Sequence, residues 1–160
     1  MFQKQWSITS HSNRRRIAAQ FYSNVRQKEM VESLHIEIQE EEQYLIAHVS
    51  GALSLGNLKE LVDIVETESK KRGYDLFLVD MLRTGPPEKE MDRFYIGEYV
   101  ASKLRGLKVA AVYPQELINK FAENTAVNRG ASLIVVGDRE QAIKWLLESQ
   151  SLPRQDTSDA

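Results

Sequence analysis

The sequence contains no cysteine, and this absence excludes a disulfide framework, a zinc–thiolate site and a thiol nucleophile. No apolar run approaches the ~20 residues that a membrane-spanning helix needs. The N-terminus also lacks the apolar core of a secretory signal. A chain with these absences suits a reducing compartment, and we expect it to be cytoplasmic, with no transmembrane segment.

Catalytic motifs are missing as well. The sequence has no glycine-rich phosphate loop of the Walker or dinucleotide type, no GxSxG elbow and no HExxH pair. Its three histidines, His11, His35 and His48, are scattered over the N-terminal arm and the first two expected strands. We therefore predict no catalytic residues, no metal site and no cofactor, and we expect that the protein is not an enzyme.

The chain is long enough for one domain, because a chain of 160 residues buries roughly 70% of the surface that its unfolded form exposes. Its net charge is −2, yet residues 1–33 hold six basic and only two acidic side chains. Such an arm can be a nucleic-acid tail, an organelle-targeting peptide or an exposed extension. One arginine triplet supplies few phosphate contacts, so we predict an exposed extension and no nucleic-acid partner.

Hydrophobic periodicity begins at residue 34, and it divides the chain into a basic extension (1–33), a domain (34–149) and a flexible tail (150–160). Segments 34–39 and 44–50 alternate like strands and should pair as an antiparallel hairpin. The segment 51–73 has the apolar stripe of a helix, with Ser54 as its N-cap and Gly73 at its end.

The continuous apolar run 74–82 predicts a strand buried on both faces, at the centre of the sheet. We predict that 83–90 is a loop, because Gly85, Pro86 and Pro87 interrupt the strand pattern. The remaining chain alternates between helices and strands. Helices are predicted over 91–104, 115–130 and 138–149, and strands over 107–113 and 132–137.

The predicted order is β-β-α-β-α-β-α-β-α, which indicates an α/β fold with a mostly parallel mixed sheet and packed helices. Binding sites in such folds form where the carboxyl ends of the strands meet helix N-termini. Arg83, Thr84 and Arg93 fall at this edge, beside the start of helix 91–104. The two arginines either favour an anion there or pair with nearby acidic side chains. Asp80 and Asp92 suit the roles of caps or loop anchors better than that of an acid–base pair.

The order of elements and several motifs resemble the STAS family, the sulfate transporter and anti-sigma factor antagonist domain, and above all its SpoIIAA-like branch of small bacterial proteins. The resemblance covers about residues 34–149. It is carried by four segments of the sequence: GALSLGNLKEL (51–61), LFLVDML (76–82) followed by MDRFYIGEYV (91–100), LKVAAVYPQELINKFAENTA (107–126) and DREQAIKWL (138–146).

In signalling members of that family, the helix that resembles 91–104 opens with Asp-Ser, and a partner kinase phosphorylates the serine. Here Asp92 is followed by Arg93. A site that would switch from neutral to about −2 on phosphorylation therefore carries a permanent positive charge. Thr84 is a nearby hydroxyl, but its place before two prolines makes it a poor substitute.

The resemblance thus implies a non-catalytic regulatory module that binds a protein or a small ligand without the phosphoserine switch. Aromatic and arginine side chains are the usual anchors of protein interfaces. The second hypothesis rests on the similar topology of CRAL-TRIO lipid-transfer domains, and is a small lipid or other apolar ligand held between sheet and helices. The residues expected to bind are Ser54, Arg83, Thr84, Asp92, Arg93, Phe94 and Tyr95.

Overall fold

The computed structural model describes residues 33–148. All of the predicted N-terminal extension except Ser33 lies outside the described residues, as does the predicted tail, so these two predictions stay predictions. No helix in the described part of the chain is long and apolar enough to cross a membrane. The elements are β1 (His35–Glu40), β2 (Leu45–Leu53), α2 (Leu55–Arg72), β3 (Leu76–Pro87), α3 (Asp92–Lys103), β4 (Lys108–Val112), η1 (Gln115–Leu117), α4 (Phe121–Val127), β5 (Ser132–Val136) and α5 (Arg139–Leu147).

The five strands form one sheet in the order β1-β2-β3-β4-β5. β1 and β2 are antiparallel and are joined by a tight turn, in which Glu41 N–H donates to the Tyr44 carbonyl at 2.9 Å. β2, β3, β4 and β5 all run parallel to their neighbours. The predicted order of elements and the α/β class are therefore confirmed, with β3 at the centre of the sheet.

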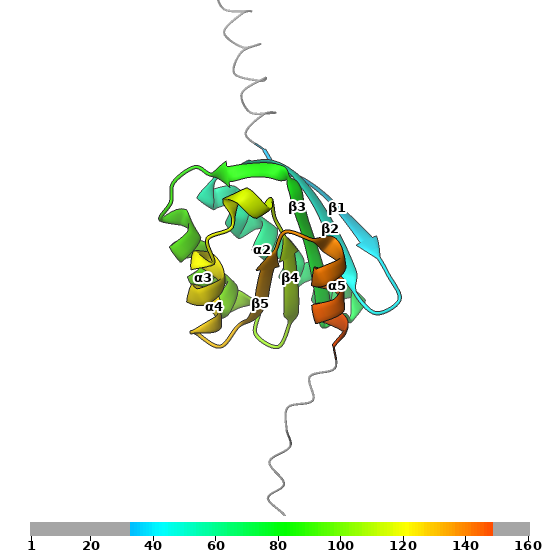
Figure 1. The fold of residues 1–160 in the computed structure, drawn as a ribbon. Helices are drawn as coiled ribbons and strands as arrows, with labels where there is room; N and C mark the ends of the chain where they lie inside the picture. Colours follow the sequence, from blue (N-terminus) through cyan, green and yellow to red (C-terminus); the bar gives the residue numbers. More distant parts are fainter. Residues whose placement is uncertain (1–32, 149–160) are drawn as a thin grey trace, which may run out of the picture. The chain divides into compact units, whose positions relative to one another are not determined.

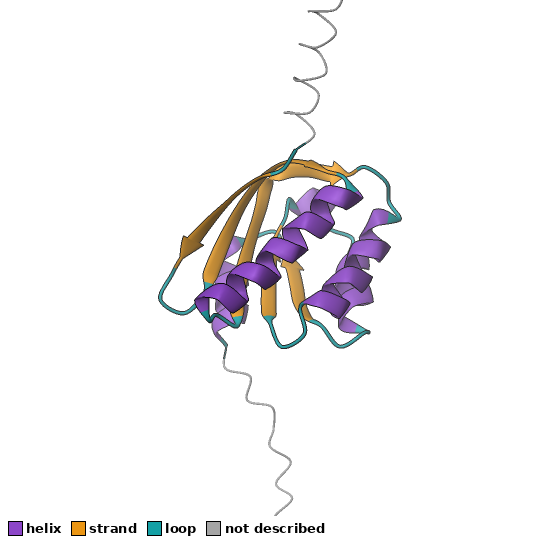
Figure 2. Cartoon of the chain, turned by 180° about the vertical axis from the view of Figure 1, so that it is seen from behind, coloured by secondary structure: helices purple, strands orange, loops and turns teal. Residues whose placement is uncertain are grey.

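Helices cover both faces of the sheet (Figure 1). α2, α3 and α4 enclose the larger core, which includes Phe77, Val79 and Tyr113, and Figure 2 shows α2 lying across that face. Among the described helices, α5 is the one on the other face, where Ile46, Leu78 and other apolar residues form a smaller core. The two cores arise because side chains alternate between the faces along each strand.

The ends of α2 follow the predicted signals. The Ser54 hydroxyl accepts a hydrogen bond from Asn57 N–H at 3.1 Å, as an N-cap does. Gly73 ends the helix with φ 75°, a left-handed conformation that glycine adopts without steric cost.

β3 is longer than predicted, and the expected loop over 83–90 is wrong for residues 83–87. The strand continues through both prolines, with Thr84 opposite Gly51 and Pro87 opposite Leu53. β4 pairs with β3 only as far as Asp80, so the extension of β3 has a single neighbour strand. Proline lacks an N–H, and an edge segment tolerates that loss because no partner needs the donor.

The predicted helix over 115–130 is interrupted: its first three residues form η1, helix α4 begins only at Phe121, and residues 128–130 form a turn. Asn119 is the cause, since its side-chain oxygen accepts from Phe121 N–H at 3.1 Å and so restarts the chain as a new helix. Lys120, which lies between Asn119 and Phe121, adopts φ 63°, a value that is uncommon for a residue with a side chain.

This interruption places two side chains of the α4 region against the free edge of β5. Glu123 Oε2 accepts a hydrogen bond from Val135 N–H at 2.7 Å, and Lys120 Nζ donates to the Val135 carbonyl. The two side chains also form an ion pair at 2.6 Å. Backbone groups at a sheet edge are a template for pairing with another chain, and here both groups of Val135 are occupied.

We predict that the double variant Lys120→Ala/Glu123→Ala self-associates more than the wild type, because Val135 then presents free backbone groups at the edge. Sedimentation velocity over a range of concentrations measures the association. The matched control is Glu66→Ala/Lys70→Ala, which removes an exposed ion pair of 2.8 Å on α2. Equal sedimentation of the double variant, the control and the wild type would show that the two side chains do not guard the edge.

Candidate functional site

The segment from Arg83 to Tyr95 leads from the end of β3 into α3, and it contains most of the residues predicted to bind. Asp92 is buried, and its carboxylate accepts from Lys89 N–H at 3.1 Å. It therefore anchors the turn before α3, which is one of the two structural roles expected for it. It is not the N-cap of α3, because Met91 takes that position.

Arg93 is mostly buried, so little of its side chain is available for the partner contact that was predicted for it. Its side chain is only 13% exposed. One terminal nitrogen, Nη2, donates to the Leu117 carbonyl at 2.9 Å. The guanidinium carbon lies 5.9 Å from the centre of the Tyr113 ring. Arg93 thus connects the start of α3 to η1 and to the residue that follows β4.

The Arg93 guanidinium is also neutralised by an acidic side chain. Its Nε lies 3.0 Å from Glu90 Oε1, although the N–H does not point at that oxygen closely enough for a hydrogen bond. Of the two readings left open for this arginine, pairing with a nearby carboxylate is therefore the one observed. With Glu90 and Asp92 at the same helix start, this end of α3 does not favour an anion.

Tyr113 completes this buried polar group. Its hydroxyl donates to the Gly85 carbonyl at 2.7 Å, which joins the end of β4 to the extended part of β3. Burial raises the pKa of the Tyr113 hydroxyl above its ordinary value, and the neighbouring Arg93 guanidinium lowers that pKa in part. The end of a predicted strand at Tyr113 placed it at the same edge of the sheet, but no motif selected it as a site residue, because its partner Gly85 is remote in the chain.

The other predicted residues have separate local roles. The Thr84 hydroxyl is buried and donates to the Met81 carbonyl at 2.7 Å, so this hydroxyl does not face solvent. Ser54 caps α2, as described above. Arg83 is exposed on β3, opposite Ser50 of β2. The structure therefore brings together Asp92, Arg93, Phe94 and Tyr95 at the start of α3, and not the whole predicted set.

An aromatic patch covers the outer side of α3 and α4. Met91, Tyr95 and Phe121 are 51%, 45% and 37% exposed. Phe94 lies among them, with its ring centre 5.7 Å from that of Tyr95 and 6.1 Å from that of Phe121. We call these four residues the aromatic patch. Phe94 and Tyr95 were predicted as contacts, whereas Met91 and Phe121 were missed.

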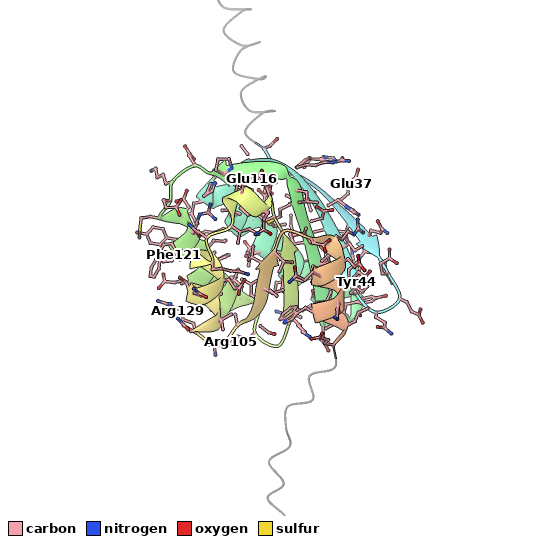
Figure 3. The ribbon with its side chains drawn as sticks, viewed as in Figure 1. Glu37, Tyr44, Arg105, Glu116, Phe121 and Arg129 are labelled. Carbon is pink, nitrogen blue, oxygen red and sulfur yellow. The ribbon has the colours of Figure 1, made fainter. Side chains whose placement is uncertain are left out.

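Charged side chains border the aromatic patch on its α4 side. The Arg129 guanidinium lies 5.3 Å from the centre of the Phe94 ring, and Arg129 pairs with Glu98 at 3.1 Å. Figure 3 shows Phe121 and Arg129 on the same side of the molecule, away from Glu37 and Tyr44. A cluster of exposed aromatic residues with a charged border is typical of a protein interface.

The inner side of α3 faces an apolar cavity of about 130 Å³ between the sheet and helices α2, α3 and α4. Arg93 and Tyr113 are the only lining residues with polar side chains among the described residues. No group of three or more acidic or histidine side chains that could hold a metal ion is present among the described residues.

Comparison with known proteins identifies the fold. A crystal structure of an anti-sigma factor antagonist from Mycobacterium paratuberculosis matches with a TM-score of 0.50 and 11% identity, over 71% of this chain and 94% of that chain. The domain therefore has the STAS fold of the SpoIIAA-like type. No family model matches the sequence, and the search of curated proteins gives no significant match.

Two further solved structures are similar at lower TM-scores. The anti-sigma factor antagonist SpoIIAA in its unphosphorylated form matches with a TM-score of 0.47 and 12% identity, over 69% of this chain and 95% of that one. A protein with a SpoIIAA-like fold from Shewanella loihica matches with a TM-score of 0.46 and 16% identity, over 71% and 94% of the two chains.

We predict that Arg93→Ser lowers the free energy of unfolding by about 1.5–3 kcal/mol, the usual range for a hydrogen bond to a charged group. Urea denaturation measures this change. Arg83→Ser is the matched control, because Arg83 is exposed and its loss should stay within about 0.5 kcal/mol. Equal midpoints for the two variants would contradict the inward placement of Arg93.

The raised pKa of the Tyr113 hydroxyl predicts that the free energy of unfolding depends on pH. Because the pKa in the folded protein is raised above the unfolded value of about 10, the stabilisation is complete below that value and is lost as pH rises through the folded pKa. The wild type should therefore lose more stability than Tyr113→Phe between about pH 9 and pH 11.5. Denaturation at several pH values gives the two slopes, and parallel slopes would contradict a raised pKa at Tyr113.

Proposed function

We propose that this protein is a regulatory module that binds a protein partner through the aromatic patch. The observation that carries the proposal is the exposure of Met91, Tyr95 and Phe121 around Phe94 at the start of α3 and α4. Large aromatic side chains supply most of the binding energy at protein interfaces. The STAS fold supports a regulatory role, since the match from Mycobacterium paratuberculosis is an anti-sigma factor antagonist.

Binding in this proposal does not depend on phosphorylation of the α3 start. Arg93 stands directly after Asp92 and has no hydroxyl group that a serine kinase could phosphorylate. Thr84, the hydroxyl considered as a substitute, is 7% exposed and already donates to the Met81 carbonyl. These two residues therefore favour a permanent contact surface, which is available whenever the protein is folded.

The partner surface should be apolar at its centre and should carry charge at its border. Arg129 and Glu98 form an ion pair beside Phe94, and both side chains are 43% exposed. Border charges of this kind guide association and orientation more than they add affinity. We therefore expect the aromatic patch to determine affinity and the Arg129–Glu98 pair to tune the association rate.

The second hypothesis places an apolar ligand between the sheet and the helices. A cavity lies there, which supports an apolar ligand, but its volume does not support a lipid. Pockets for ordinary ligands measure roughly 300–1,000 Å³. The cavity of about 130 Å³ is smaller, so a whole lipid does not fit inside it. The protein-binding function is therefore the one we favour for the domain.

We predict that Tyr95→Asp and Phe121→Asp each weaken partner binding at least about tenfold, because a charge replaces an apolar anchor. The test is quantitative affinity capture from the protein's own organism, followed by titration of the purified partner. Leu147→Asp is the matched control, since Leu147 is 41% exposed on α5, on the other face of the sheet.

The control should retain the partner that both patch variants lose. Circular dichroism should show that all three variants are as folded as the wild type. If the two patch variants bind every captured protein as tightly as the wild type does, then the aromatic patch is not the docking surface.

A further inference from the structure

The cavity beneath α3 is suited to an apolar occupant and unsuited to water. An ordered water in a protein interior needs two to four polar partners. Arg93 Nη2 donates to the Leu117 carbonyl and the Tyr113 hydroxyl donates to Gly85, so among the buried polar atoms of these two residues only Arg93 Nε has no hydrogen-bond partner. One free donor is fewer than the two partners that a water needs at least. The rest of the lining is carbon, from residues such as Val79, Val100 and Leu133.

Small residues where α3 packs on α4 explain the open space. A Cβ atom on Gly97 would lie 2.7 Å from the Ala122 carbonyl oxygen and 2.7 Å from Thr125 Cβ, so no larger residue fits at this point. Gly97, Ala111 and Ala122 all line the cavity, and their short side chains leave it unfilled. The two helices therefore approach each other closely while the volume below them stays open.

We propose that this cavity binds a compact, uncharged apolar molecule of about the size of benzene. A cavity of roughly 150 Å³ with apolar walls is known to stay dry and to accept benzene or xenon. The volume here, about 130 Å³, lies close to that value. An occupant would restore the contacts that an empty cavity loses, so filling the space is favourable.

The proposed site is separate from the aromatic patch and does not depend on protein docking. α3 contributes Ile96, Gly97 and Val100 to the cavity, whereas Tyr95 on the same helix is 45% exposed to solvent. An occupant would therefore contact the inner side of the helix whose outer side carries the patch. If the cavity binds no ligand, the proposal of protein docking still stands. If the aromatic patch binds no partner, the proposal of a ligand in the cavity still stands.

The experiment is a titration of the full chain with benzene, followed by methyl NMR. The wild type should show saturable shifts at the methyl groups of Val79, Val100 and Leu133, which line the cavity. The methyl groups of Ile46 and Leu146, in the core beneath α5, should not move. A rise in melting temperature with benzene concentration is the second readout.

The cavity-filling variant is Ala111→Leu, which should weaken benzene binding at least tenfold. Its control, Ala52→Leu, makes the same change at an exposed residue of β2 and should bind as the wild type does. If Ala111→Leu does not fold, Ala111→Val and Val79→Ile add less volume, and each should weaken binding by a smaller factor.

Three results would overturn the proposal. The first is the absence of saturable shifts in the wild type, which would show that the cavity is a packing void that does not bind benzene. The second is a folded Ala111 variant that binds benzene with wild-type affinity. The third is palmitate producing the same methyl shifts as benzene, because a long acyl chain does not fit a compact cavity.

Discussion

The inward position of Arg93 is the constraint on which the candidate site depends. Its guanidinium donates to the Leu117 carbonyl, lies over the Tyr113 ring and faces Glu90, so one side chain joins the start of α3 to the segment from Tyr113 to Leu117. A charged group that is mostly buried is costly unless it is paired in this way. Because Arg93 makes these contacts without any modification, they hold the start of α3 in one arrangement.

This constraint gives α3 two sides with different properties. With Arg93 turned inward, Ile96, Gly97 and Val100 follow it toward the core, and Tyr95 is left in solvent beside Phe94. The outer side supports the proposal of protein binding, and the inner side supports the proposal of a compact apolar ligand. Both proposals therefore depend on the same short helix, although each can fail without the other.

Much of the fold could be predicted from periodicity, because α2 and the buried run of β3 bury their apolar residues at regular spacing. The errors occur where a tertiary neighbour decided the local structure. Pro86 and Pro87 remain in a strand because β2 alone pairs with that stretch. The contacts of Arg93 with Leu117 and Tyr113 were not predicted, because no sequence pattern shows that these residues will lie beside it. Phe121 was missed for a similar reason, since its contact with Phe94 joins two helices.

The most direct test of the central claim is NMR of the Arg93 side chain. A guanidinium that belongs to a side chain only 13% exposed and donates to the Leu117 carbonyl should give resolved, slowly exchanging Hη signals. It should also give nuclear Overhauser effects to the Tyr113 ring. Averaged Hη signals that exchange at the rate of free arginine, with no contact to Tyr113, would contradict the account.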